Sequence, residues 1–269
     1  MARAVKRPNF SPKLPSLPRL PDPNVPDVFE EMTLLEHMEE LRDRIVKTAI
    51  GIGLTFIVGL FLAIPLLKLI KREANVPQGF DILSPTEPLT LYVKVAFYIA
   101  VAIAMPLIVW QFIGFLAPGL TGKEKRILFS SLPFVALLFF VGAGYAFFFA
   151  IPRALWFLSN LFPDLIDWSP QGNEIISFYL TLMVGIGLAF ELPVVMFLLA
   201  KLNIVSPKRM RQYRKYAAVA ILVVSAIITP TTDPFNMALV AGPLLALYEI
   251  GILVSFFLTR SKTSASAAP

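Results

Sequence analysis

Long apolar stretches separated by shorter polar segments dominate this chain. A helix needs about 20 residues to cross the hydrocarbon core of a bilayer. Six stretches approach or exceed that length, at about residues 45–67, 89–116, 127–151, 174–202, 216–229 and 235–258. The pattern predicts an all-α integral membrane protein with six transmembrane helices, of which the two C-terminal ones are short.

The fifth stretch is the shortest of the six. Residues 216–229 form about 21 Å of helix, against about 30 Å of hydrocarbon. Either the bilayer thins there, or the last two spans form a short hairpin beside longer helices. Prolines interrupt other stretches at Pro106, Pro133, Pro193 and Pro243. Each is expected to kink its helix or to free a backbone carbonyl, because proline has no N–H and clashes with the preceding turn.

An amphipathic helix is predicted at 28–44, directly before the first span. Apolar residues recur there every three or four positions, which is the spacing of one helical face. Glu36, Glu40 and Asp43 share one narrow stripe of that helix. Two interpretations stay open. The stripe is a solvated face in which Glu40 pairs with Arg44 at i,i+4, or it binds a cationic ligand.

Composition agrees with a membrane protein. Of 269 residues, 57% are hydrophobic and 16% are charged, and the mean hydropathy is +0.72. In soluble proteins, hydrophobic residues average about 45–50% and charged residues about 25%. The composition therefore excludes a water-soluble globule. The chain has no Cys and a single His, His37, which excludes disulfides, thiolate metal sites and Cys nucleophiles. We therefore expect no metal, no cofactor and no enzymatic activity.

Charge predicts the orientation and the domain organisation. With the N-terminus inside, the cytoplasmic segments hold 18 Lys and Arg and the opposite loops hold 4. The positive-inside rule then places both termini in the cytoplasm. This topology accounts for the net charge of +6, and no nucleic-acid partner is expected. Residues 28–260 form the membrane domain, while the Pro-rich tail 1–27 and the tail 261–269 are expected to be disordered.

Glu191 is the most informative single residue. It lies ten residues before Lys201, near the middle of the fourth span. A carboxylate there costs several kcal/mol unless it is protonated, paired or facing water. It is either a neutral acid hydrogen-bonded between helices or a polar site in a cavity. Glu249 lies closer to the cytoplasmic end and carries a weaker signal, while Asp233 is expected to cap the last span.

The loop between the second and third spans is short, turn-forming and aromatic at one end. It runs from Phe115 through Pro118 to Glu124, which stands among three cationic residues in the sequence. Local charge neutralisation explains Glu124 as well as a binding role does.

The chain resembles the TatC family, the multi-span core receptor of the twin-arginine protein translocase. The resemblance runs in order over about residues 33–258. Five segments carry it: LEHMEELRDR (35–44), FLAPGLTGKEKR (115–126), FELPV (190–194), TPTTD (229–233) and YEIG (248–251). The resemblance implies six spans with both ends in the cytoplasm, in a bacterial inner membrane. The tail at 1–27 departs from the family pattern.

The resemblance also implies a function and a site. The family binds signal peptides with paired arginines and moves folded proteins across the membrane, with single-span TatA and TatB partners, the proton-motive force and an oligomeric receptor complex. By matching position, Glu40 and Glu124 would receive the guanidinium groups, with Phe115 and Arg42 nearby. Glu191 would line a polar groove or contact a partner. Weaker candidates complete the set: Glu36, Pro118, Asp233 and Glu249.

Three other functions are weighed against this one. A proton-coupled small-solute transporter would use Glu191, but it would need a repeat around a mid-membrane site, and no convincing repeat is visible. An intramembrane hydrolase needs a nucleophile and a base within the membrane, which a single His outside the spans does not supply. A scaffold without recognition chemistry is the third alternative.

Overall fold

The computed structural model describes residues 34–74, 80–116, 122–162, 170–202, 204–231 and 233–260. Within them the chain is all-α, as the sequence predicts. Its helices, in order, are α1 (Leu34–Glu73), α2 (Glu87–Leu116), α3 (Gly122–Tyr145), the π-helical turn η2 (Ala146–Ala150), α4 (Ile151–Ser159), α5 (Gly172–Ala189), α6 (Leu192–Lys201), α7 (Pro207–Gln212), α8 (Arg214–Ile228) and α9 (Pro234–Arg260). The predicted tails at 1–27 and 261–269 lie outside the described residues.

Five helical stretches in this part of the chain are long and apolar enough to cross a membrane. They are Leu35–Glu73, Glu87–Phe115, Glu124–Ser159, Gly172–Lys201 and Pro234–Phe257. These stretches coincide with five of the six predicted spans. The other predicted span falls on α8, whose 15 residues give about 22 Å of helix. This helix is too short to count with the others, so a sixth span stays a prediction.

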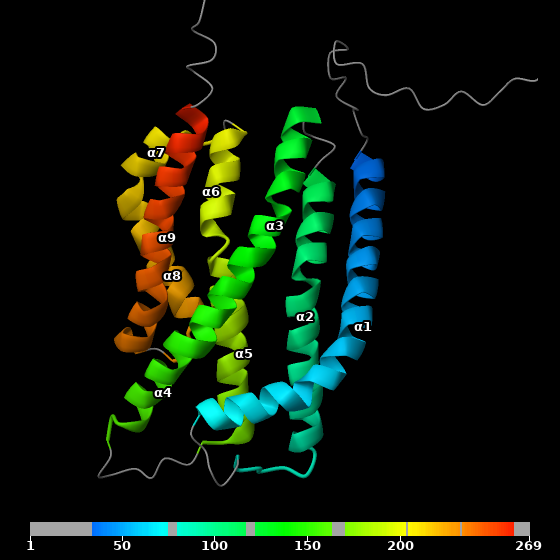
Figure 1. Cartoon of the computed structure of the whole chain (residues 1–269), viewed down its shortest axis with the longest axis vertical. Helices are drawn as coiled ribbons and strands as arrows, with labels where there is room; N and C mark the ends of the chain where they lie inside the picture. Colours follow the sequence, from blue (N-terminus) through cyan, green and yellow to red (C-terminus); the bar gives the residue numbers. More distant parts are fainter. Residues whose placement is uncertain are drawn as a thin grey trace, which may run out of the picture.

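The helix α1 is the longest, with 40 residues. It bends in its second half and then crosses α2 toward α5 (Figure 1). Pro65 lies in that half, where its missing N–H and its ring weaken the turn before it. The helix continues to Glu73, whereas the apolar stretch in the sequence ends at about residue 67. The apolar stretch therefore does not mark the end of the helix.

The third span also continues beyond its predicted end. One continuous helix runs over Glu124–Ser159, whereas the predicted third stretch ends at about 151, so that predicted end is wrong. The cause is burial, since Ile151, Ala154 and Leu155 all pack into the core. Burial of these apolar side chains stabilises the extra turns of helix.

The fourth span is interrupted in its middle. The helix α5 ends at Ala189 and α6 begins at Leu192, with Phe190 and Glu191 between them. Pro193 has no N–H to donate to the carbonyl of Ala189, four residues earlier, so the helical ladder is broken there. The interruption places the acidic residue of this span at a helix junction.

Close packing joins α1 to α2. A Cβ atom on Gly59 would lie 2.2 Å from the carbonyl oxygen of Ala96, so the two backbones touch. The Thr55 hydroxyl donates to the carbonyl oxygen of Ala100 over 2.9 Å. Small residues and hydroxyl groups at such crossings are typical of helices packed within membranes.

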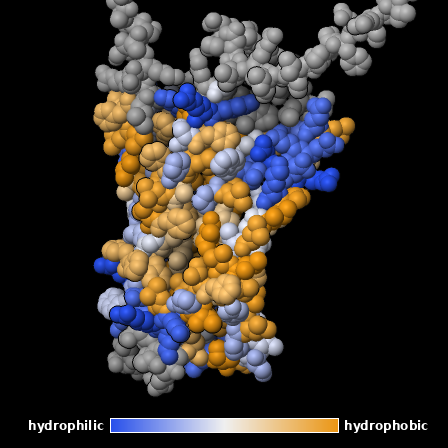
Figure 2. Space-filling model, turned by 45° about the vertical axis from the view of Figure 1, so that its right-hand side comes forward, coloured by the Kyte–Doolittle hydropathy of each residue, from blue (hydrophilic) through white to orange (hydrophobic). Residues whose placement is uncertain are grey.

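The outer surface carries an apolar band. Figure 2 shows hydrophobic side chains over the middle of the molecule, with hydrophilic side chains gathered near its upper end and a smaller group toward the lower end. Large apolar side chains in the band are exposed, including Phe61 and Phe148. Apolar exposure on this scale requires a lipid or protein partner, and together with the span lengths it indicates a membrane protein.

Candidate functional site

Three helix ends lie together at one end of the molecule. They are the start of α1, the end of α2 and the start of α3, at the upper end of Figure 1. Both α1 and α3 contact α2, and the three helices carry Glu40, Phe115 and Glu124 respectively. The two carboxylates expected to act together are thus on the same end of the protein. Pro118, the weaker candidate between them, lies outside the described residues.

Glu40 is already bound to a guanidinium group. Arg44 donates to Glu40 Oε1 from Nη2 over 2.6 Å and from Nε over 3.0 Å. The i,i+4 pair that the sequence left as one alternative is therefore present. Nη1 of the same arginine donates to Gln111 Oε1 on α2 over 3.3 Å, so the pair also ties α1 to α2.

Gly114 makes room for this arrangement. A Cβ atom at that position would lie 2.1 Å from Arg44 Nη1 and 2.5 Å from Arg44 Cζ. Any larger residue would push the guanidinium group off its place. Sequence reasoning missed this role, because nothing in the local pattern around Gly114 shows which side chain of another helix lies opposite.

The second carboxylate oxygen of Glu40 does not take part in the pair with Arg44. Oε2 is buried and has no hydrogen-bond partner among the described residues, while Oε1 receives both bonds from Arg44. Buried carboxylate oxygens in folded proteins nearly always have a donor. Within the described residues this oxygen is thus an acceptor without a donor.

Phe115 stacks on His37. Their ring centroids lie 4.3 Å apart, with the ring planes at 19°. His37 is half-buried, so the ring of Phe115 covers part of it. The stack fixes the ring of Phe115 next to the turn of α1 that leads to Glu40.

The remaining candidates at this end are more exposed. Glu36 and Arg42 are exposed on α1, and Glu124 is half-buried in the first turn of α3, where the helix dipole favours an acidic side chain. Arg42 lies two positions from Glu40, a rotation of about 200° around the helix. Its side chain thus begins on the opposite side of α1 from Glu40.

Glu191 is buried at the junction of α5 and α6. Its exposed fraction is 8%, and neither carboxylate oxygen has a hydrogen-bond partner in the described part of the chain. It lines a cavity of about 310 Å³ together with residues of α8 and α9, such as Ile221 and Leu244. The other residues that line this cavity are almost all apolar, so both interpretations of Glu191 stay open.

The two weaker acidic candidates have structural partners. Glu249 on α9 forms an ion pair with Arg214 at the start of α8, so it joins those two helices. Asp233 caps α9, since its Oδ1 accepts from the backbone N–H of Asn236 over 2.7 Å. The predicted capping role of Asp233 is confirmed.

Comparison with known proteins identifies relatives over most of the chain. The family model described as Sec-independent protein translocase protein (TatC) matches residues 36–243. TatCy of Bacillus subtilis (strain 168) is 35% identical over 240 residues, which cover 88% of this chain and 94% of the relative. TatC of Aquifex aeolicus (strain VF5) is 38% identical over 241 residues, or 86% and 98%. A crystal structure of the twin-arginine translocase receptor TatC matches with a TM-score of 0.72 at 34% identity, covering 83% of this chain and 100% of that one.

Fold, sequence and relatives together define a polytopic helical membrane protein of a Sec-independent protein translocase. Members of this class are translocation components and not known enzymes. The chain belongs to the TatC family, and it is a core component of the twin-arginine translocase. None of the relatives named above is a solute transporter, so that alternative has no support.

Proposed function

We propose that the end formed by α1, α2 and α3 binds signal peptides with paired arginines. The observation that carries this proposal is the placement of Glu40 and Glu124 at one end, on two helices that flank α2 and the ring of Phe115. One short peptide segment laid across the end of α2 would bring one arginine to each carboxylate.

The chemistry of the two acids suits arginine better than lysine. A guanidinium group is a planar fork of N–H donors that matches the two oxygens of a carboxylate, whereas an ammonium group is a point charge. The pair between Arg44 and Glu40 shows that this carboxylate accepts a guanidinium group within the chain, with both donors on the one oxygen Oε1. An arriving arginine would donate to Glu40 Oε2, which Arg44 does not use, and this requires the carboxylate to turn that buried oxygen toward the surface.

The strength of these contacts limits what they do. A hydrogen bond to a charged group contributes about 1.5–3 kcal/mol, so two arginines contribute about 3–6 kcal/mol. A dissociation constant of 1 mM already requires about 4 kcal/mol. The arginines therefore select the peptide, and tight binding requires burial of its apolar region as well.

Removal of both acids tests the proposal. We expect a variant with Glu40→Ala and Glu124→Ala to lose crosslinking to an Arg-Arg signal peptide while its helix content and Tm stay near those of the parent. Glu39→Ala serves as the control, because Glu39 is an exposed acid on the same helix and its loss should leave crosslinking intact. Unchanged crosslinking of the double variant would contradict the assignment.

The proposal extends to topology and partners. We infer six spans, with α8 as the short fifth one, and both termini in the cytoplasm of a bacterial inner membrane. Support comes from the 18-to-4 excess of Lys and Arg and from the start of α1 and the end of α9 lying at the same end of the molecule (Figure 1). Single-span TatA and TatB would assemble with this receptor in an oligomer and move folded cargo, driven by the proton-motive force.

Glu191 belongs to a later step in this scheme. The burial of its carboxyl group and the cavity beside α8 and α9 support a single acidic group in an otherwise apolar groove, which thins the bilayer locally or receives a polar residue of a partner helix. The site lies in a different part of the molecule from Glu40, at the junction of α5 and α6. Loss of Glu191 would therefore affect transport more than peptide capture.

A further inference from the structure

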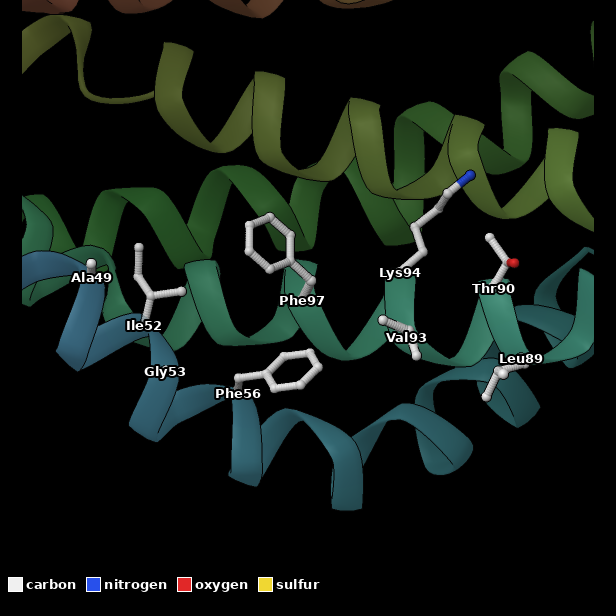
Figure 3. A pocket seen from close by; sticks show the side chains of 9 residues that line it. All are labelled: Ala49, Ile52, Gly53, Phe56, Leu89, Thr90, Val93, Lys94 and Phe97. Atoms are coloured by element: carbon white, nitrogen blue, oxygen red, sulfur yellow. The ribbon is translucent and has the colours of Figure 1, made fainter.

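A second, larger hollow lies between α1 and α2. Its volume is about 910 Å³, and its walls are mostly apolar, with Phe56 on α1 and Val93 and Phe97 on α2 (Figure 3). Two polar groups, Thr90 and Lys94, line the same hollow. We call this hollow the α1–α2 groove.

The groove lies on the outer face of the α1–α2 pair, where Gly53 is exposed. A Cβ atom added to Gly53 would meet nothing within 4 Å, although Gly53 lines the groove. Two turns further along α1, Gly59 touches the backbone of Ala96. The space beside Gly53 can therefore take an additional apolar group, while the contact at Gly59 forms part of the floor on which α1 and α2 meet.

Lys94 supplies the positive charge of the groove. Its Nζ donates to Asn173 Oδ1 over 2.6 Å and to Ser177 Oγ over 3.0 Å, both on α5, and Figure 3 shows the side chain reaching toward that helix. Both acceptors are neutral, so they do not compensate the charge. An ammonium group has three donors, and these two bonds leave one for an anionic group.

The position of Lys94 fits a lipid headgroup. It lies seven residues into α2, or about 10 Å from the start of the helix, and it bonds to Asn173 in the first turn of α5. Both helix starts are at the lower end of Figure 1, away from the described termini. A lysine stem that runs along apolar surface with its head at the membrane interface is a typical place for a phosphate.

We propose that the α1–α2 groove binds one anionic glycerophospholipid of the leaflet opposite the termini. One acyl chain lies along Gly53, Phe56 and Phe97, and the phosphate accepts a hydrogen bond from Lys94. Charge complementarity favours this occupant over the uncharged apolar region of a peptide, which would leave the ammonium group without a counter-ion.

Native mass spectrometry of the purified full-length chain tests the site. The protein is equilibrated with equal amounts of phosphatidylglycerol and phosphatidylcholine, and the lipids retained on the protein are counted. We expect the parent to retain one phosphatidylglycerol. We expect Lys94→Gln to lower the preference for phosphatidylglycerol over phosphatidylcholine by about tenfold, the contribution of one hydrogen bond to a charged group, because the choline cation already neutralises the phosphate of phosphatidylcholine.

Two glycine variants separate the groove from the surface in general. Gly53→Leu fills the space of the acyl chain and should abolish retention of both lipids. Gly144→Leu is the matched control, because a Cβ there also meets nothing within 4 Å and Gly144 does not line the groove. Equal retention in the Gly53→Leu and Gly144→Leu proteins would overturn the proposal. A groove that holds no lipid would also overturn the proposal if a Gly53→Cys variant crosslinks there to a signal peptide or to a second copy of the chain. That molecule would then be the occupant of the groove.

Discussion

Glu40 is oriented before any ligand arrives. Arg44 holds one carboxylate oxygen, Gln111 holds the arginine, and Gly114 leaves room for both. Such an arrangement fixes the direction of the second oxygen and reduces the entropy that a ligand must remove on binding. Arg44 is thus a positioning residue in the proposed site, although its charge matches that of the ligand.

Addition of one methyl group at Gly114 tests whether Arg44 positions Glu40. Gly114→Ala should displace the Arg44 guanidinium group and weaken binding of an Arg-Arg peptide by roughly tenfold, the contribution of one oriented charged hydrogen bond. Alanine is the better helix former by about 1 kcal/mol, so a loss of binding would not reflect loss of the helix. Gly242→Ala, where a Cβ meets nothing within 4 Å, is the control in a peptide-binding titration. Tighter binding by Gly114→Ala would mean that Arg44 competes with the ligand.

The sequence predicts contacts within one helix better than contacts between helices. The spacing of Glu40 and Arg44 was enough to suggest their pair, because residues four apart share a helix face. The stack of His37 on Phe115 and the clearance at Gly114 were missed. They depend on the rotation of α1 against α2, which no local pattern specifies.

At the scale of the element, the interruption between α5 and α6 determines the position of Glu191. Pro193 breaks the ladder, and the acid sits at the break facing a cavity. A buried carboxyl group without a partner is unfavourable, so this residue is retained at a cost in stability. Such a cost is typical of residues that serve function.

Replacement by leucine separates stability from transport. Glu191→Leu should raise the stability of the purified protein by about 1–3 kcal/mol, since an unsatisfied polar group is removed from an apolar site. It should also reduce export of a folded reporter and leave crosslinking to the signal peptide unchanged. Glu174→Leu, at an exposed acid of α5, is the control. Wild-type export by Glu191→Leu would return Glu191 to a purely structural role.

Helix cores were easier to predict than helix ends. The apolar stretches located the five long spans, because about 20 apolar residues in sequence have few other structures available. The sequence did not predict that α1 continues to Glu73 or that the third span continues to Ser159. Beyond the bilayer, helix continuation depends on burial against neighbours, as at Ile151 and Leu155, and hydropathy does not record those neighbours.

At the scale of the whole molecule, the charge asymmetry makes a direct prediction about sidedness. The chain has no cysteine, so single-cysteine variants need no prior substitution. Ser84→Cys and Lys208→Cys are both at exposed positions, on opposite sides in the proposed topology. A membrane-impermeant maleimide should label Ser84→Cys on intact spheroplasts and Lys208→Cys only after permeabilisation. The reverse pattern would contradict the cytoplasmic position of the binding end.

In the proposed site, two carboxylates at one end of the protein each bind one arginine of a signal peptide. A double-mutant cycle measures this most directly. The affinities of Arg-Arg, Lys-Arg and Arg-Lys peptides are determined for the parent, Glu40→Gln and Glu124→Gln. The account predicts a coupling energy above about 1 kcal/mol between each acid and one particular arginine, since groups in contact do not act additively. Coupling within about 0.5 kcal/mol of zero for every pair, the range of independent sites, would contradict it.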